Sequence, residues 1–362
     1  MFFWKTFGGS FVVAVVGLTA GFIYGGGTGL AVAAILAVLE VSLSFDNAVV
    51  NATVLVRMSP FWQKIFLTVG VAIAVFGMRL VFPLLIVGIT AKLTPAEAIR
   101  LALEKGDPKQ EGTYGFLLHE AHPAIAAFGG IFLLVLFLDF ILEERELTWL
   151  TWIERPLAKI GKLDQLSVVI SLTALAIAAY TLAPANKIST VLVSGVLGLV
   201  TYLVVNSLGE FFQNEEEGVV SEVAGKQVMH VVGKAAFFLF LYLEVLDASF
   251  SFDGVVGAFA ITSDPILIAI GLGIGAMFIR SLTVYLVRKG TLNEYVFLEH
   301  GALWAIGALA VILLFTMRYE VPEVVTGLIG VGFIGAALAS SIVRNRRMPA
   351  EEVHHIEIGA AV

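Results

Sequence analysis

Long apolar runs, separated by short polar segments, dominate the chain. A helix of about 20 apolar residues spans the hydrocarbon core of a bilayer, and about ten runs here reach or approach that length. They lie near residues 8–25, 28–56, 62–89, 123–142, 166–183, 188–208, 228–261, 265–287, 297–316 and 322–343. The pattern predicts an all-α polytopic membrane protein of about ten transmembrane helices. The second and seventh runs are long enough to predict tilt, a break or an end in water.

Composition supports a membrane protein. Hydrophobic residues make up 59% of the chain and charged residues 14%, with a mean hydropathy of +0.94, whereas soluble domains carry about 25% charged residues. There is no basic patch with interleaved aromatic residues, so nucleic-acid binding is not expected. The absence of cysteine excludes disulfides, thiolate metal sites and cysteine nucleophiles. We see no nucleophile–base arrangement and no phosphate-binding loop, so neither an enzyme nor a bound cofactor is expected.

The charges of the loops predict the orientation. With ten spans both termini lie on one side, and that side collects fourteen of the 22 Lys and Arg residues, against six on the other side. The positive-inside rule therefore predicts that both termini lie in the cytoplasm. The first run lacks a small-x-small cleavage site, so we expect a retained helix. Its Gly17, Gly21 and Gly25 have the spacing that lets membrane helices approach closely.

Three polar segments carry local predictions. In the outer loop 90–122, Thr94, Pro95 and Glu97 form a capping-box signature that predicts a short surface helix. The loop 143–165 mixes Trp with charged residues and predicts an interfacial helix on the cytoplasmic face. The acidic stretch 215–222 is expected to be a solvated loop.

A nine-residue motif occurs twice. VLEVSLSFD at 38–46 and VLDASFSFD at 245–253 share six residues, and the shared polar residues are rare in apolar helices. In the run that follows each motif, an arginine stands nine residues after a glycine: Gly70 precedes Arg79, and Gly271 precedes Arg280.

The third runs of the two units also match, because HPAIAAFGG from His122 resembles HGALWAIGA from His300. We therefore predict one membrane domain made of repeat 1 (28–142), an intervening segment with two helices (143–227) and repeat 2 (228–316). The repeats are five spans apart, an odd number, so they should be inverted, as in transporters whose shared site lies near the bilayer midplane.

The motifs concentrate oxygen ligands inside the membrane. At 100° per residue, Glu40, Ser44, Asn47 and Asn51 share one helix face, and Asp46 lies about 120° away. In the second motif Glu244, Asp247, Ser251 and Gly254 share a face, and Asp253 lies elsewhere on the helix. Local unwinding at S-F-D-N or S-F-D-G could bring the two directions together, because Asn and Gly tolerate irregular backbone.

The charges of these helices do not balance. Five carboxylates face two arginines, and each charge costs about 2.5–3.5 kcal/mol at the bilayer centre on insertion scales. Carboxylate, amide and hydroxyl oxygens without cysteine form a hard ligand set suited to Mn²⁺, Ca²⁺ or Mg²⁺. The competing interpretation is structural ion pairing with the arginines.

The candidate metal ligands are Glu40, Asp46, Asn47, Glu244, Asp247 and Asp253. The charge-compensating candidates are Arg79 and Arg280, and the secondary candidates are Ser44, Asn51, Ser251, His122 and His300. Both histidines are more typical of ordinary helix starts than of ligands.

The residues Glu40 to Asn47, with their echo at Asp247 to Gly254 and the arginine in each following run, resemble the TerC family. This family, named for tellurium resistance, belongs to the LysE-like transporter superfamily, and the resemblance is closest to a branch labelled as a domain of unknown function. It implies an inner-membrane protein of inverted three-helix repeats, linked to manganese efflux and metal homeostasis, with the matching acids as ion site. The chain departs from the pattern at Gly254, where the first motif has Asn47, and at the extra acid Glu244.

These observations predict a secondary transporter that exports a divalent cation, with Mn²⁺ favoured, possibly by exchange for protons. One alternative is a LysE-type exporter of a small organic solute, in which an arginine would bind a substrate carboxylate. The other is a non-transporting membrane scaffold in the response to metal or tellurite stress. The predicted partners are the metal ion and the lipid bilayer, and no oligomeric state is predicted.

Overall fold

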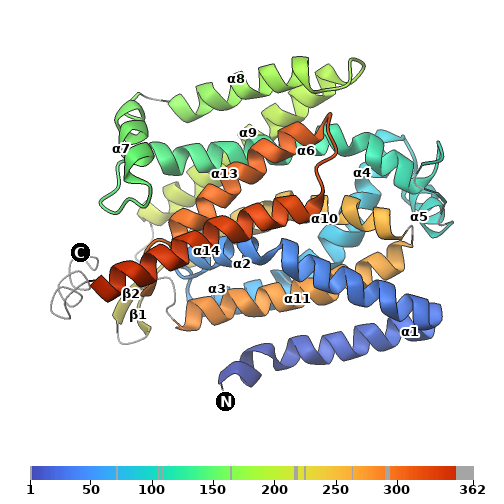
Figure 1. Cartoon of the computed structure of the whole chain (residues 1–362), viewed down its shortest axis with the longest axis horizontal. Helices are drawn as coiled ribbons and strands as arrows, with labels where there is room; N and C mark the ends of the chain where they lie inside the picture. The colour runs from blue at the N-terminus through green and yellow to red at the C-terminus, as the bar shows by residue number, and fades with distance from the viewer. Residues whose placement is uncertain are drawn as a thin grey trace.

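The computed structural model describes residues 2–70, 72–104, 106–107, 109–163, 165–215, 219–223, 226–262, 264–289 and 294–347, and it is almost entirely helical (Figure 1). Within a few of these elements the side chains lie outside the described part. Each of the ten predicted runs is helical over most of its described length, although residues 228–230 of the seventh run belong to a strand. Most of the long helices run along the horizontal axis of Figure 1, with α7 and a short hairpin at the left end and α5 at the right end.

Helix α1 (Phe2–Leu43) contains two of the predicted runs. It is broken at Gly25 and Gly26, and Gly26 has a φ of +63°, a left-handed value that glycine adopts without strain. The chain folds back there, so that Gly21 and Gly29 lie against each other, because a Cβ on Gly29 would overlap the Gly21 carbonyl. Gly17 packs on Ile274, which confirms the predicted close approach of the glycine-rich face.

The first acidic motif is interrupted, as its length and composition predicted. α1 ends at Leu43 and α2 (Phe45–Leu55) begins after Ser44, whose φ of −98° and ψ of 17° are not helical. Helix α10 (Gly233–Ile261), which holds the second motif, is continuous. The predicted unwinding is therefore confirmed in the first motif, and the second motif stays helical.

The segment after the first motif is wound partly as π-helix, which the sequence did not indicate. Its elements are α3 (Pro60–Ile65), η1 (Phe66–Gly70), η2 (Ile73–Val81) and α4 (Phe82–Thr90). π-Turns inside helices are rare and occur frequently at functional sites. This one carries Arg79.

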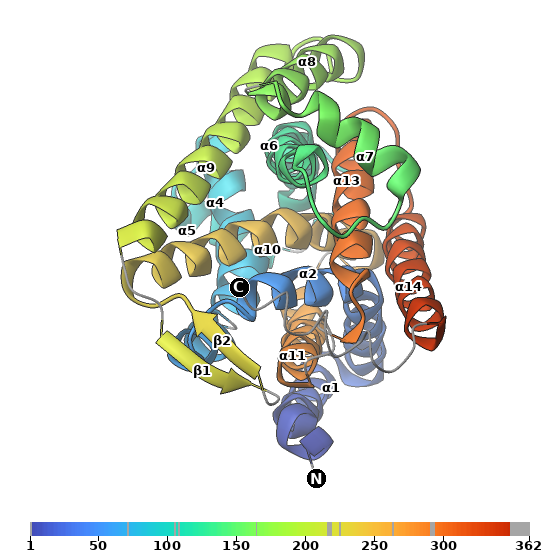
Figure 2. The same ribbon diagram turned by 90° about the vertical axis from the view of Figure 1, so that its left-hand side faces the viewer.

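The outer loop contains α5 (Pro95–Leu103), which confirms the predicted surface helix. The Thr94 side chain accepts from the Glu97 N–H and the Glu97 carboxylate accepts from the Thr94 N–H, so both halves of the capping box are present. Helix α6 (Tyr114–Leu142) follows and is the centre of the largest apolar cluster, where it packs against α9 and α13. Figure 2 shows α6 nearly end on, surrounded by other helices.

The rest of the chain forms α7 (Thr151–Ile160), α8 (Leu166–Thr181), α9 (Ile188–Glu215), α11 (Pro265–Lys289), α13 (Leu298–Thr316) and α14 (Glu323–Arg347). Between α9 and α10, strands β1 (Val219–Val223) and β2 (Lys226–His230) pair antiparallel. The sequence predicted a solvated loop and no hairpin here. The end of the hairpin is attached to the bundle, because Val231 N–H donates to the Arg57 carbonyl.

Seven helical segments of the described chain are long and apolar enough to cross a membrane: 6–42, 60–89, 114–142, 188–208, 265–287, 298–316 and 325–347. The number is smaller than the ten expected for three reasons. The folded-back α1 counts once, α8 has only 16 residues, and α10, which carries three acids, is not among the seven. In Figure 1 the second half of α1 runs from right to left and α10 runs from left to right.

Candidate functional site

Glu40 and Arg79 form a buried ion pair between α1 and η2. Their side chains are each 3% exposed, and Arg79 Nη2 donates to Glu40 Oε1. The π-turn presents the carbonyl of Ala74, five residues back, to Arg79 Nη1 at 2.6 Å. Ser44 Oγ donates to the same Glu40 oxygen at 3.1 Å. The negative charge of Glu40 is therefore neutralised by Arg79, and the Ser44 hydroxyl adds a hydrogen bond to the same carboxylate.

Arg280 on α11 serves two acids of α10. Its Nη2 donates to Asp247 Oδ2 at 3.1 Å, and its Nη1 lies 3.5 Å from Glu244 Oε1. The guanidinium also stacks on Phe66 of η1, with 3.8 Å between Cζ and the ring centroid. Neither oxygen of Glu244 receives a hydrogen bond from the described residues. This cluster holds one more carboxylate than arginine.

The two ion pairs occupy matching positions. Glu40 and Asp247 are both the third residue of the nine-residue motif, and each pairs with the arginine that follows nine residues after Gly70 or Gly271. Each of the two arginines thus pairs with one motif acid, and their role in compensating the charge of an ion site stays a prediction.

The two units also pack against each other. A Cβ on Gly70 would lie 2.5 Å from Glu244 Oε1, and a Cβ on Gly271 would lie 2.5 Å from Leu36 Cβ. The glycine of each unit thus lies against the motif helix of the other. A methyl group on Gly271 would meet Leu36 Cβ and the Ala33 carbonyl, which leaves no room for it, whereas a methyl group on Gly70 would force the end of the Glu244 side chain to shift.

Gly254 explains the departure of the second motif from the first. A Cβ at Gly254 would lie only 3.2 Å from Glu40 Oε2, and a Cβ at Gly275 of α11 would overlap the Glu40 side chain. An asparagine at 254, as in the first motif at Asn47, would therefore require the Glu40 carboxylate to shift. The first motif acid thus reaches the second motif, and the two units share one polar region.

Three further candidate residues at the first motif are also buried. Like Glu40, the residues Ser44, Asn47 and Asn51 are at most 7% exposed. Asn51 is fully buried, and neither polar atom of its amide has a hydrogen-bond partner among the described residues. An unsatisfied buried amide costs about 1–3 kcal/mol. The side chains of Asp46, Ser251 and Asp253 lie outside the described residues.

The described acids do not gather as a metal cage by themselves. Within the described part of the chain, no group of three His, Asp or Glu side chains is close enough to hold a metal ion. Glu40, Glu244 and Asp247 are instead directed at arginines. The metal site predicted from the sequence therefore depends on Asp46 and Asp253.

The two histidines lie apart from the acidic motifs. His122 of α6 is buried and stacks on His119, with 6.3 Å between the ring centroids. His300 of α13 is buried against Phe140, and its Nδ1 lies 3.2 Å from a carboxylate oxygen of Glu154 on α7. His300, a secondary metal candidate, therefore lies beside Glu154 and not beside the motif acids.

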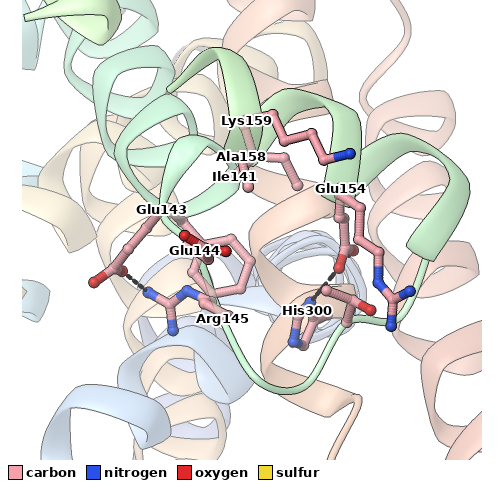
Figure 3. Close-up of a pocket in the computed structure, with 11 residues that line it drawn as sticks. Ile141, Glu143, Glu144, Arg145, Glu154, Ala158, Lys159 and His300 are labelled. Carbon is pink, nitrogen blue, oxygen red and sulfur yellow. Dashed lines mark hydrogen bonds and ion pairs between the residues drawn. The ribbon is translucent and has the colours of Figure 1, made fainter. Parts of the chain in front are cut away.

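Sequence reasoning missed Glu154. The loop predicts an interfacial helix without assigning a role to Glu154, but the Glu154 carboxylate is buried and accepts from Trp149 N–H at 2.9 Å, Leu150 N–H at 3.2 Å and Trp304 Nε1–H at 3.1 Å. A signal was available, because Glu154 is four residues after Leu150 and three before Leu157, on the apolar side of the helix. Figure 3 shows Glu154 directed at His300 within a pocket at this end of the bundle.

A search of protein families finds one match, which covers residues 45–348 and is described as "Protein of unknown function (DUF475)". No curated protein and no solved structure matches the chain.

Proposed function

The chain belongs to the DUF475 family of proteins of unknown function, and from this premise and the buried acid–arginine pairs we propose that it is a membrane transporter that exports a divalent metal cation. Mn²⁺ is the favoured substrate. The observation that carries the proposal is the charge imbalance at the contact between the two units, where the described part of the chain holds three buried carboxylates and two arginines.

Asp46 and Asp253 increase this imbalance. With them the two motif helices carry five carboxylates against two arginines, and so much uncompensated charge inside a membrane requires a cation or protons. All side-chain ligands offered are oxygens of carboxylates, amides and hydroxyls, which suits Mn²⁺, Ca²⁺ or Mg²⁺ better than softer ions. The unpartnered amide of Asn51 adds an oxygen that gains a partner if an ion or water reaches it.

We further propose that ten helices cross the membrane and that residues 28–142 and 228–316 form inverted repeats. The matching ion pairs, the reciprocal glycine contacts and the opposite directions of the second half of α1 and α10 support this arrangement (Figure 1). It accords with the resemblance to the TerC family and with an inner-membrane location in which both termini are cytoplasmic. In Figure 1 the start of α1 and the end of α14 lie toward the same end as α7.

In this proposal each charged residue has a defined task. Asp46 and Asp253 would coordinate the ion, with Glu40, Asn47 and Asp247 nearby to complete the shell. Arg79 and Arg280 hold Glu40 and Asp247 when no ion is bound. Glu244 would accept a proton during exchange, because its oxygens receive no hydrogen bond that protonation would break.

The ion pairs weigh against export of an organic solute. Such a transporter needs an arginine for the substrate carboxylate, whereas Arg79 and Arg280 are both directed at acids of the chain and are nearly inaccessible. Competition between manganese and an amino acid in a flux assay separates the two functions. A scaffold would not require the acids, so Asp46→Ala together with Asp253→Ala would leave its phenotype intact.

The proposal is tested by manganese tolerance. Cells that lack the protein should tolerate less manganese, wild-type protein should restore tolerance, and Asp46→Asn should not. The exposed Glu111→Gln, which also removes one negative charge, should restore tolerance as well as wild type. Full restoration by Asp46→Asn at normal membrane abundance would contradict the proposed site.

A further inference from the structure

Helix α7 lies across the end of the helix bundle. Figure 2 shows it crossing over the ends of α6 and α13, at a steep angle to the long helices of the bundle. Its inner side is attached by Glu154, whose carboxylate is hydrogen-bonded to Trp304 and lies beside His300 of α13. A helix in this position, across the ends of membrane helices, lies in the plane of the bilayer surface.

The outer face of α7 alternates apolar and basic residues. At 100° per residue, Trp152, Arg155, Lys159 and Ile160 fall within one arc of about 140°, opposite Glu154. All four are exposed, and the Trp152 side chain is 77% exposed. An exposed tryptophan beside a lysine and an arginine is typical of helices that lie in the headgroup region of a membrane.

A pocket with a volume of about 160 Å³ opens beside this face, between α7, the end of α6 and the start of α13 (Figure 3). Three carboxylates line it, and each is already satisfied. Glu143 pairs with Arg145 at 2.5 Å, Glu144 pairs with Lys162 at 3.3 Å, and Glu154 receives the hydrogen bonds given above.

Two cations of the pocket lining are left over. Arg155 and Lys159 line the pocket, and the described residues give neither of them an acidic partner. Glu154 is held by neutral donors, so the four cations Arg145, Arg155, Lys159 and Lys162 exceed the three carboxylates by one, and the pocket offers one surplus positive charge to a ligand. A compact anionic group, such as a phosphate diester, matches this charge.

We propose that this pocket binds the phosphate headgroup of an anionic phospholipid. Arg155 and Lys159 hold the phosphate, while Trp152 and Ile160 enter the apolar part of the same leaflet. These two apolar side chains favour a lipid over a free anion, since a soluble phosphate would gain nothing from them. Basic pockets at the cytoplasmic ends of membrane helices suit such headgroups. The site is independent of the proposed transport, because it uses none of the motif residues.

The test is native mass spectrometry of delipidated wild-type protein titrated with dioleoylphosphatidylglycerol or dioleoylphosphatidylcholine. We expect at least about tenfold tighter binding of the anionic lipid, because two basic residues near a membrane surface contribute about fivefold each. The double variant Arg155→Gln/Lys159→Gln should lose this preference. Its control, Arg100→Gln/Lys109→Gln, removes two exposed charges near α5 at the other end and should keep the preference within about twofold.

Several results would overturn the proposal. These are equal binding of the two lipids, an undiminished preference in the Arg155/Lys159 variant, or an equal loss in the control. Displacement of the anionic lipid by millimolar inorganic phosphate would identify a site for free anions instead. A dimer mass that disappears in the Arg155/Lys159 variant would identify a second copy of the chain as the occupant. All substituted residues are exposed, so both variants should fold, and unchanged thermal unfolding in detergent checks this.

Discussion

Glu244 is a buried acid whose carboxylate receives no hydrogen bond from the described residues. We predict that Glu244→Gln stabilises the folded protein. Arg280 Nη1 lies 3.5 Å from its carboxylate, which is worth about 4–5 kcal/mol of attraction at an effective dielectric constant of 20. Asp247 is one helical turn away, and at about 6 Å it repels Glu244 by about 3 kcal/mol on the same scale. The remaining attraction of about 2 kcal/mol is smaller than the several kcal/mol needed to desolvate a carboxylate.

The neutral amide avoids this cost and leaves Arg280 with Asp247 as a balanced pair. We therefore expect Glu244→Gln to raise the free energy of unfolding by about 1–2 kcal/mol. Arg280→Gln should lower it by about 3–5 kcal/mol, because it leaves two buried carboxylates without a cation. The exposed Glu111→Gln is the control and should change it by less than about 0.5 kcal/mol.

Reversible unfolding in mixed detergent micelles measures all three variants. A loss of stability in Glu244→Gln comparable to that of Arg280→Gln would refute the reasoning, because it would mean that the ionised Glu244 contributes to the pair. If Glu244 carries the exchanged proton, the same variant should also make metal flux insensitive to a pH gradient while leaving metal binding intact.

Three further predictions follow from other contacts. Gly70→Ala should lower the free energy of unfolding by about 1–3 kcal/mol, because the added methyl group would be forced against Glu244. Gly77→Ala, whose added methyl group would have its nearest neighbour 3.4 Å away, should lower it much less in the same unfolding assay. Glu154→Gln should make the α7 loop more susceptible to limited proteolysis, because the weaker acceptor holds the Trp and His donors less tightly; unchanged cleavage would contradict this. Hydrogen bonds from the backbone and hydroxyl of Thr94 lower the pKa of Glu97. The ionised Glu97 therefore stabilises α5 at neutral pH, and this stabilisation is lost as the pH falls through the lowered pKa. Amide hydrogen exchange in α5 should differ between wild type and Glu97→Gln at pH 7 and should coincide in strong acid.

The sequence predicted the helices because each apolar run had to be helical within a membrane, where every backbone group needs an internal partner. It also indicated that the two arginines lie among the motif acids, since charged residues are rare in such runs, but it did not predict which acids they pair with. The structure supplies the partners, because it pairs Glu40 with Arg79 and Asp247 with Arg280 at matching positions of the repeat.

Other features depend on tertiary contacts that no local pattern reveals. The π-turns before Arg79 have no compositional signature, although they direct its guanidinium toward Glu40 and the Ala74 carbonyl. The role of Gly254 becomes visible only when the Glu40 carboxylate is seen against it. Glu154 and His300 are 146 residues apart, so their contact could not be inferred from either segment alone.

The most direct test of the account is metal flux in vesicles that contain only the purified protein, screened with Mn²⁺, Ca²⁺, Mg²⁺ and Zn²⁺. The account predicts flux of Mn²⁺ that is lost in Asp46→Asn and in Asp253→Asn but kept in Glu111→Gln. Absence of flux for all four ions in folded wild-type protein, or flux that survives both aspartate substitutions, would contradict it.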